Sequence, residues 1–314
     1  MIPLLLVSGI IFLWSGAELL VRGGASLALR LGIPILVIGL TIMGYGTGTP
    51  ELVVSVQAVL VGKGDIALGN VIGSNIANTA LILGLAAIFR PIPVKKQFLI
   101  HELPFMTLIT GGFCILLLMT NHIGRLLGLL FLFGIVLYTY RAIRHGRRNY
   151  ELIKLEQKEI NHLKLKNWWL EFVFILLGLI ILIFGGNFFL RGSILLAKIF
   201  NISDAVIAVT VVALGTSLPE LVLSIIANLK KQGDFIIGNI VGSNIFNILV
   251  IVGVTAMVQP IQIVGITWED YTSMLFLAVI MWMMAKANNI ISRFEGIILL
   301  SGYVAFIWYQ YSSL

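Results

Sequence analysis

Apolar runs of about 20 residues fill most of this chain and constrain its fold more than any other feature. A run of that length lets an α-helix cross the hydrocarbon core of a bilayer. Only 11% of the 314 residues are charged, and the mean hydropathy is +1.04, which excludes a soluble domain. We therefore predict an all-α polytopic membrane protein with ten spans. The spans lie near residues 3–28, 34–60, 66–89, 98–119, 123–144, 168–196, 205–228, 235–258, 266–286 and 290–311.

The positive charges predict how these spans are oriented. Threading them alternately through the membrane places 17 of the 21 Lys and Arg residues on one side, which the positive-inside rule makes cytoplasmic. Both termini then lie outside, and the loop at residues 145–167 is cytoplasmic. The first run lacks the charged start and the cleavage site of a signal peptide, so we expect it to be retained. The predicted location is the plasma or inner membrane.

We interpret the net charge of +7 as the excess of Lys and Arg in the predicted cytoplasmic loops. The lipid bilayer is the expected surrounding. We expect no nucleic acid and no obligatory protein partner.

A short motif occurs twice and reveals an internal repeat. Gly46–Glu51 reads GTGTPE and Gly215–Glu220 reads GTSLPE, with the glutamates 169 residues apart. The same offset relates Gly16 to Gly185, Arg22 to Arg191, Asp65 to Asp234, Asn78 to Asn247 and Pro91 to Pro260.

The repeat divides the chain into residues 1–144, with spans one to five, a linker at 145–167, and residues 168–314, with spans six to ten. Because five is odd, the second half must enter the membrane in the opposite sense. Two inverted repeats with broken helices are typical of a secondary transporter.

The repeated motifs bring oxygen atoms to membrane depth. Proline and glycine interrupt a helix, and such backbone is tolerated there only around a protein-lined cavity. An ionisable residue at that depth indicates a functional site by default. A second repeated element, Gly69–Asn78 and Gly238–Asn247, adds serines and asparagines four residues apart, on one helix face. The predicted ligand set comprises the side chains of Glu51, Glu220, Thr47, Thr216, Ser217, Ser74, Ser243, Asn78 and Asn247, with backbone carbonyls freed near Gly44 and Ala213.

Oxygen atoms are the only ligands in this set, which suits a hard cation such as Ca²⁺. Two carboxylates match the charge of one divalent ion. No resident cofactor is expected, because the cation is the cargo. The single cysteine, Cys114, is interpreted as a packing residue.

Other polar residues have structural interpretations. Asn75 and Asn244 are expected to serve helix packing. Glu18 has Arg22 one turn later and is expected to pair with it. Glu102, Glu171, Glu269 and Asp270 lie near predicted span ends and are expected to face water or headgroups. The charged linker is expected to be a short solvated helix.

The paired GT-x-x-PE and GN-x-x-GSN elements resemble the two alpha-repeats of the calcium/cation antiporter superfamily, closest to its sodium/calcium exchanger branch in prokaryotic inner membranes. The resemblance covers the chain outside the central loop. It implies broken helices at the second, third, seventh and eighth spans. It also implies Glu51 and Glu220 as central calcium and sodium ligands, with Thr47 and Thr216 beside them. By the same resemblance, Ser74, Ser243 and Ser217 would serve flanking sodium sites, and Asn78 and Asn247 would line the middle.

The implied activity is Na⁺/Ca²⁺ antiport by alternating access, which would expel Ca²⁺. The mobile part is expected to be the first and sixth spans, whose matched glycines would slide against the remaining helices. Two residues depart from the family pattern. Gly48 stands where serine is usual, which removes a hydroxyl from a sodium site, and Asn247 stands where many members have aspartate, which disfavours potassium dependence.

Three alternatives remain open. Ca²⁺/H⁺ exchange is the nearest, because buried glutamates can take up protons and Gly48 weakens the argument for sodium. A cation channel would use similar ligands, but the inverted repeat favours a carrier. An enzyme is disfavoured, because no nucleophile with a base, histidine-bound metal or phosphate-binding cluster lies near the motifs.

Overall fold

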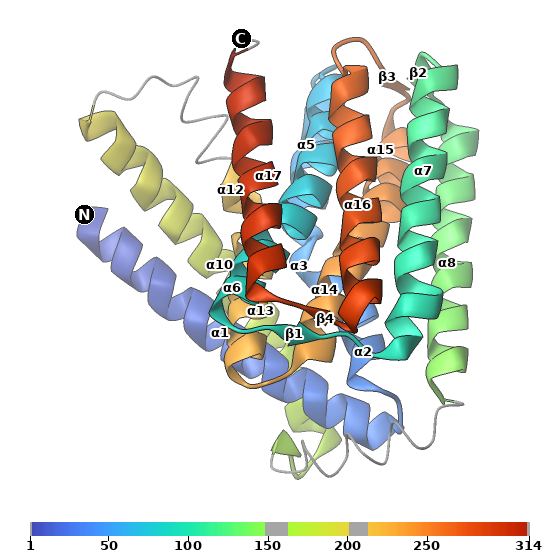
Figure 1. Cartoon of the computed structure of the whole chain (residues 1–314). Coiled ribbons are helices and arrows are strands. Elements are labelled where there is room, and N and C mark those ends of the chain that lie inside the picture. The colour runs from blue at the N-terminus through green and yellow to red at the C-terminus, as the bar shows by residue number, and fades with distance from the viewer. Residues whose placement is uncertain (1, 148–162, 201–212, 313–314) are drawn as a thin grey trace.

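Helices form at the predicted spans in the computed structural model, which describes residues 2–147, 163–200 and 213–312 (Figure 1). The first half contains α1 (Ile2–Leu31), α2 (Ile35–Ile38), η1 (Gly39–Met43), α3 (Gly44–Thr47), α4 (Thr49–Leu60), α5 (Gly64–Ile76), η2 (Ala77–Ile82), α6 (Leu83–Phe89), β1 (Ile92–Pro93), η3 (Phe98–Glu102), α7 (Leu103–Met119), β2 (His122–Ile123) and α8 (Arg125–Arg147). The second half contains α10 (Trp168–Ile199), α12 (Ala213–Thr216), α13 (Leu218–Leu229), α14 (Gly233–Phe246), η6 (Asn247–Ile251), α15 (Val252–Val258), β3 (Ile261–Gln262), α16 (Trp268–Asn288), β4 (Ile290–Ile291) and α17 (Arg293–Ser312). The η segments are π-helical turns.

Six of the described helical stretches are long and apolar enough to cross a membrane. The helices α16 and α17 occupy the predicted ninth and tenth spans and are long enough to cross a membrane, but they are less apolar than these six stretches. Most of the predicted linker helix and the start of the predicted seventh span lie outside the described residues. The six stretches are Ile2–Leu31, Gly64–Phe89, Phe98–Met119, Arg125–His145, Trp168–Leu196 and Gly233–Val258.

Burial separates a central pair of helical stretches from an outer layer. Within the most apolar window of Gly233–Val258, 94% of the residues are buried, and the value for Gly64–Phe89 is 78%. The other four long stretches range from 22% to 39%. Their exposed faces carry large apolar side chains such as Leu108 and Leu126. Such faces suit contact with lipid, whereas the second repeated element, Gly69–Asn78 and Gly238–Asn247, lies in the two most buried stretches.

Matched segments of the two halves pack reciprocally. Strand β1 pairs with β4, and β2 pairs with β3, so each two-residue strand of one half finds its partner in the other half. The helices follow the same rule, because α6 packs on α17 and α15 packs on α8. Close glycine contacts permit both approaches: a Cβ at Gly84 would lie 2.9 Å from the carbonyl oxygen of Gly296, and one at Gly253 would lie 3.1 Å from that of Gly128.

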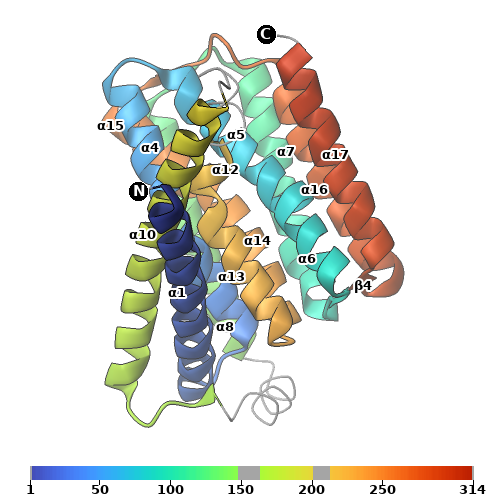
Figure 2. The same ribbon diagram turned by 90° about the vertical axis from the view of Figure 1, so that its left-hand side faces the viewer.

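The helices α1 and α10 lie side by side along most of their length (Figure 2). A Cβ at Gly16 would lie 2.6 Å from the backbone nitrogen of Leu182, and one at Gly185 would lie 2.6 Å from that of Leu13. These glycines therefore join the two helices to each other, which corrects the expectation that they face the other helices. Two other glycines of these helices face different elements: Gly24 faces Met43, and Gly186 approaches Pro219.

The third and eighth spans are continuous, not broken. Their backbone stays right-handed helical where α5 passes into η2 at Ala77 and where α14 passes into η6 at Asn247. The change is from an α-helix to a π-helical turn, which widens the helix locally. Such turns frequently occur at functional sites. The interruptions predicted from proline and glycine are confined to the second and seventh spans.

Candidate cation site

The break in the second span places Glu51 at the start of a helix. Gly48 lies between α3 and α4, and Pro50 occupies the first turn of α4, where its missing N–H is not needed. Glu51 lies in the same first turn. The N-terminal end of a helix favours negative charge, so the local fold supports a carboxylate at this position.

The seventh span repeats this arrangement. Ser217 is the N-cap residue of α13, Pro219 follows in the first turn, and Glu220 completes it. The helix α12 ends at Thr216, directly before the cap. Ala213, expected to offer a free carbonyl, is the first residue of α12.

The two glutamates are buried and incompletely hydrogen-bonded. Glu51 is 1% exposed and Glu220 is 2% exposed. Ser217 Oγ donates a hydrogen bond of 3.3 Å to Oε1 of Glu51, which joins the two halves. Oε2 of each glutamate is fully buried and has no hydrogen-bond partner among the described residues. The two carboxylates lie close enough for their charges to repel each other when both are ionised. Two ionised carboxylates with unpaired oxygens at this depth would need a compensating cation.

The motif threonines lie beside the glutamate of the opposite half. Thr47 lies near Glu220, and Thr216 lies near Glu51. Thr47 Oγ1 donates to the carbonyl oxygen of Met43 at 3.0 Å and to Oδ1 of Asn239 at 3.4 Å. Thr216 Oγ1 is buried and has no hydrogen-bond partner in the described part of the chain. Both hydroxyls are therefore at the carboxylate pair.

The asparagines at the start of the π-helical turns each present an unpaired oxygen. Asn78 and Asn247 are both 1% exposed. Nδ2 of Asn78 donates to Oδ1 of Asn244 at 3.1 Å, and Nδ2 of Asn247 donates to Oδ1 of Asn75 at 2.9 Å. Within the described ranges, Oδ1 of Asn78 and Oδ1 of Asn247 have no hydrogen-bond partner. Neutral carbonyl oxygens of this kind are suitable ligands for hard cations.

The two motif serines have different surroundings. Ser243 is fully buried, and its hydroxyl donates to the carbonyl oxygen of Gly44 at 3.3 Å. That carbonyl also accepts the Gly48 N–H at 3.3 Å, because α3 completes a helical turn before the break. Cation ligation by carbonyls freed near Gly44 stays a prediction. Ser74 instead lines a cavity.

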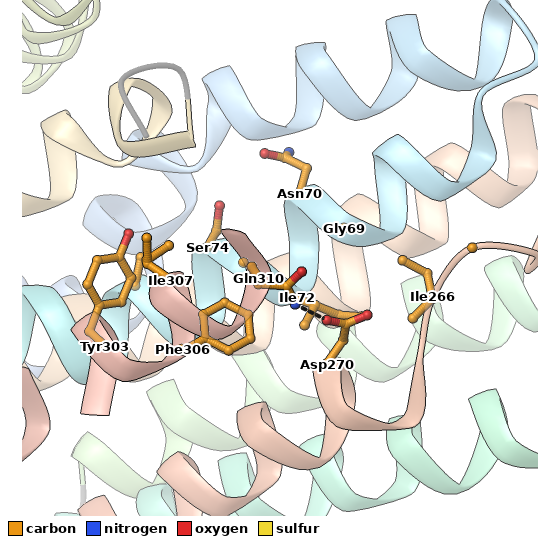
Figure 3. Close-up of a pocket in the computed structure, with 13 residues that line it drawn as sticks. Gly69, Asn70, Ile72, Ser74, Ile266, Asp270, Tyr303, Phe306, Ile307 and Gln310 are labelled. Carbon is orange, nitrogen blue, oxygen red and sulfur yellow. Dashed lines mark hydrogen bonds between the residues drawn. The ribbon is translucent and has the colours of Figure 1, made fainter. Parts of the chain in front are cut away.

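This cavity has a volume of about 350 Å³ and lies between α5 and the helices α16 and α17 (Figure 3). Asn70 and Ser74 line it from α5. Asp270 and Tyr303 line it from the other helices, and Asp270 accepts a hydrogen bond from Gln310. Neither Glu51 nor Glu220 lines the cavity. It therefore reaches one flank of the predicted ligand set.

The halves differ at a pair of matched asparagines. Asn70 Nδ2 donates to Oγ of Ser55 at 2.9 Å and to the carbonyl oxygen of Glu51 at 3.1 Å. Its counterpart Asn239 accepts from Thr47, while its Nδ2 has no partner among the described residues. The supporting roles of Asn70 and Ser55 were not predicted. The repeated asparagine in GN-x-x-GSN was the available signal.

Several acidic residues outside the motifs have other partners than expected. Glu18 forms an ion pair with Lys230, not with Arg22. Glu171 is fully buried, accepts from Arg30 Nε at 2.7 Å and from Ser26 Oγ at 2.6 Å, and so does not face water. Glu102 is also buried and accepts from the Tyr138 hydroxyl at 2.9 Å. In each case the packing of a distant helix supplies the partner.

The site thus combines carboxylates, hydroxyls and amides from both halves. In the described part of the chain, no three or more His, Cys, Asp and Glu side chains gather as a metal site. Neutral oxygens would have to complete any coordination shell. A multi-pass helical membrane protein with such a central, buried set of oxygens belongs to the class of cation transporters.

Comparison with known proteins identifies the family within that class. The family described as "Sodium/calcium exchanger protein" matches residues 1–144 and 170–312. The chain is 36% identical to CaxA of Alkalimonas amylolytica, covering 98% of this chain and 96% of that protein. It is 29% identical to the sodium/calcium exchanger MaX1 of Methanosarcina acetivorans, covering 97% of each. The solved structure of the sodium-calcium exchanger NCX_Mj superimposes with a TM-score of 0.84 at 28% identity, covering 99% of this chain and 100% of that one.

The chain therefore belongs to the sodium/calcium exchanger family and is a multi-pass calcium/cation antiporter of the membrane. Its family and its structural neighbours are transporters, not enzymes.

Proposed function

We propose that this protein exchanges Na⁺ for Ca²⁺ by alternating access and expels Ca²⁺ across the plasma or inner membrane. Glu51 and Glu220 carry the proposal: each is buried, each has one unpaired oxygen, and their charges interact. One Ca²⁺ would neutralise both. A calcium ion and a full set of sodium ions cannot occupy the pair together, because cations repel strongly in a confined site of low dielectric constant. Competition for shared ligands then couples the two fluxes.

The remaining predicted ligands are assigned to this exchange. Asn78 and Asn247 contribute amide oxygens between the carboxylates, and the hydroxyls complete the sodium positions. The unpaired oxygens of both asparagines and of Thr216 support this assignment. The proposed hydroxyl ligands are those of Thr47, Thr216, Ser217, Ser74 and Ser243.

The proposed architecture is ten spans in two inverted repeats, residues 1–144 and 168–314, with a cytoplasmic linker at 145–167 and both termini outside. The reciprocal pairing of β1 with β4 and of β2 with β3 supports a two-fold relation between the halves. The charge bias of the loops supports the orientation.

The second candidate is Ca²⁺/H⁺ exchange. Gly48 favours it, because the first half lacks the hydroxyl that Ser217 supplies in the second. Carboxylates that share one site can exchange a proton for a cation.

Uptake into proteoliposomes discriminates the two candidates. We expect ⁴⁵Ca²⁺ uptake to follow an outward Na⁺ gradient and to be abolished by Glu51→Gln. Uptake driven by an outward H⁺ gradient, with no response to Na⁺, would instead establish proton coupling. Absence of uptake under both gradients would reject calcium antiport.

A further inference from the structure

Asn75 and Asn244 lie next to the predicted ligands and engage both ends of their own amides. Both are buried, at 2% and 3% exposure. Asn75 Nδ2 donates to the carbonyl oxygen of Asn244 at 3.3 Å and contacts Met274 Sδ at 3.6 Å. Asn244 Nδ2 donates to Thr79 Oγ1 at 2.9 Å and contacts Met106 Sδ at 3.6 Å. Residues of the other half thus hold the donors of both side chains, and this fixes where the Oδ1 atom of each side chain points.

Each of these oxygens receives the amide of a predicted ligand. Oδ1 of Asn75 accepts from Asn247, and Oδ1 of Asn244 accepts from Asn78. The four residues thus form two crossed pairs, because Asn75 and Asn78 of one half bind Asn247 and Asn244 of the other. The offset of 169 residues relates the pairs, so the same contact is built twice.

The crossed pairs decide which end of each ligand amide is available to a cation. An amide carries its donor and acceptor on opposite sides, so fixing Nδ2 fixes the direction of Oδ1. Oδ1 of Asn78 and Oδ1 of Asn247 are the atoms left without partners in the described structure. A flipped amide would present N–H groups and repel a cation.

We propose that Asn75 and Asn244 are positioning residues for ion binding, which hold the amides of Asn247 and Asn78 with their oxygens toward the cation. This inference rests on the proposed calcium transport. It assigns no direct cation contact to Asn75 or Asn244, whose oxygens are already occupied. A positioning role differs from a role in helix packing alone. Loss of positioning should change the orientation of the ligand amide, and therefore cation affinity, whereas loss of packing should change stability.

A substitution at the neighbouring ligand, Asn247, distinguishes a role of Asn75 in amide orientation from a role in helix packing. Asn75→Leu keeps the approximate volume but removes the acceptor for Asn247. We expect the half-saturating concentration for ⁴⁵Ca²⁺ binding to rise about 10- to 100-fold, the usual effect of losing an outer-shell partner. A carboxylate has two equivalent oxygens and needs no such orientation. In an Asn247→Asp background, the same Asn75→Leu change should therefore raise that concentration by only about twofold.

The repeat-related change, Asn244→Leu, should have the same large effect alone and the same small effect in an Asn78→Asp background. If Asn75→Leu does not fold, Asn75→Ser is tested in its place. Asn228→Leu is the matched control: Asn228 is buried and donates to the carbonyl oxygens of Ala86 and Arg90, away from the predicted ligands. It should lower thermal stability without changing calcium affinity.

Equilibrium ⁴⁵Ca²⁺ binding is measured on purified protein that elutes as a single species. Its outcome distinguishes failure of the positioning role from failure of the proposed function. Unchanged affinity in folded Asn75→Leu and Asn244→Leu would overturn the positioning role, as would an equal loss in the aspartate backgrounds. If the wild type binds no Ca²⁺, the proposed function itself fails. Retention of transport rate at saturating Ca²⁺, with a raised half-saturating concentration, is the expected kinetic signature.

Discussion

The ring of Phe246 occupies the space that a side chain at residue 48 would need. A Cβ at Gly48 would lie 2.8 Å from Cδ1 of Phe246, and this ring stacks on Tyr45 with centroids 5.1 Å apart. By the repeat offset, Phe246 corresponds to Ala77 and Gly48 corresponds to Ser217. The pair of Gly48 with Phe246 and the repeat-related pair of Ser217 with Ala77 therefore each combine one residue of the first half with one of the second, and the larger side chains, Ser217 and Phe246, both come from the second half. With the Phe246 ring in this position, the space beside residue 48 is too small for a serine side chain.

This relationship predicts a paired substitution. Gly48→Ser alone should reduce folded protein and transport, because the ring has to move. Gly48→Ser with Phe246→Ala should restore both and supply the absent hydroxyl. We expect the double variant to need less Na⁺ for half-maximal uptake, measured as ⁴⁵Ca²⁺ flux against Na⁺ concentration. Phe246→Ala alone is the control. If this single variant lowers the Na⁺ requirement equally, the added hydroxyl is not the cause.

A second prediction concerns the carboxylate pair. Glu220→Gln should raise the half-saturating Ca²⁺ concentration by more than about 100-fold, because loss of a direct ligand exceeds the effect of an outer-shell change. Glu102→Gln is the matched control, since Glu102 is also buried and its amide analogue can still accept from Tyr138. Equilibrium ⁴⁵Ca²⁺ binding measures both. Similar losses in the two variants would mean that general destabilisation, not ligation, is being measured.

A third prediction follows from the packing of α1 on α10. Because their glycines join them to each other, we expect these helices to move together relative to the other helices. In a Cys114→Ala background, cross-linking cysteines at Phe12 and Phe188, whose rings are 5.7 Å apart, should leave uptake intact. Cross-linking cysteines at Glu18 and Lys230, which join α1 to the turn after α13, should block uptake. Undiminished exchange with the second link in place would refute the movement.

A fourth prediction tests the ion pair between α1 and α10. Arg30→Gln leaves the Glu171 carboxylate buried without its cationic partner, so it should lower the thermal unfolding temperature in detergent. Adding Glu171→Gln should recover much of the loss. Lys230→Gln, which breaks the partly exposed pair with Glu18, should change the temperature less. The order of the three unfolding temperatures is the measurement, and a larger loss in Lys230→Gln would contradict the assignment.

Much of this protein could be predicted from local sequence patterns. The apolar runs located the helices to within a few residues, for example 98–119 for Phe98–Met119. Pro50 and Pro219 indicated the breaks because a missing N–H acts at its own position in the chain. The repeat offset located matched ligand candidates, because internal duplication is written directly in the sequence.

Partners between distant helices could not be predicted in the same way. Glu18 has Arg22 one turn away, yet it pairs with Lys230 across 212 residues. Asn75 and Asn244 were expected to serve packing, and only their geometry shows that they hold the amides of two predicted ligands. Local spacing fixes which face of a helix a residue occupies. The sequence by itself thus determined where the helices and the buried acids lie, whereas the packing of the two halves decided which oxygens remain unpaired, because a hydrogen-bond partner depends on contacts that no local spacing encodes.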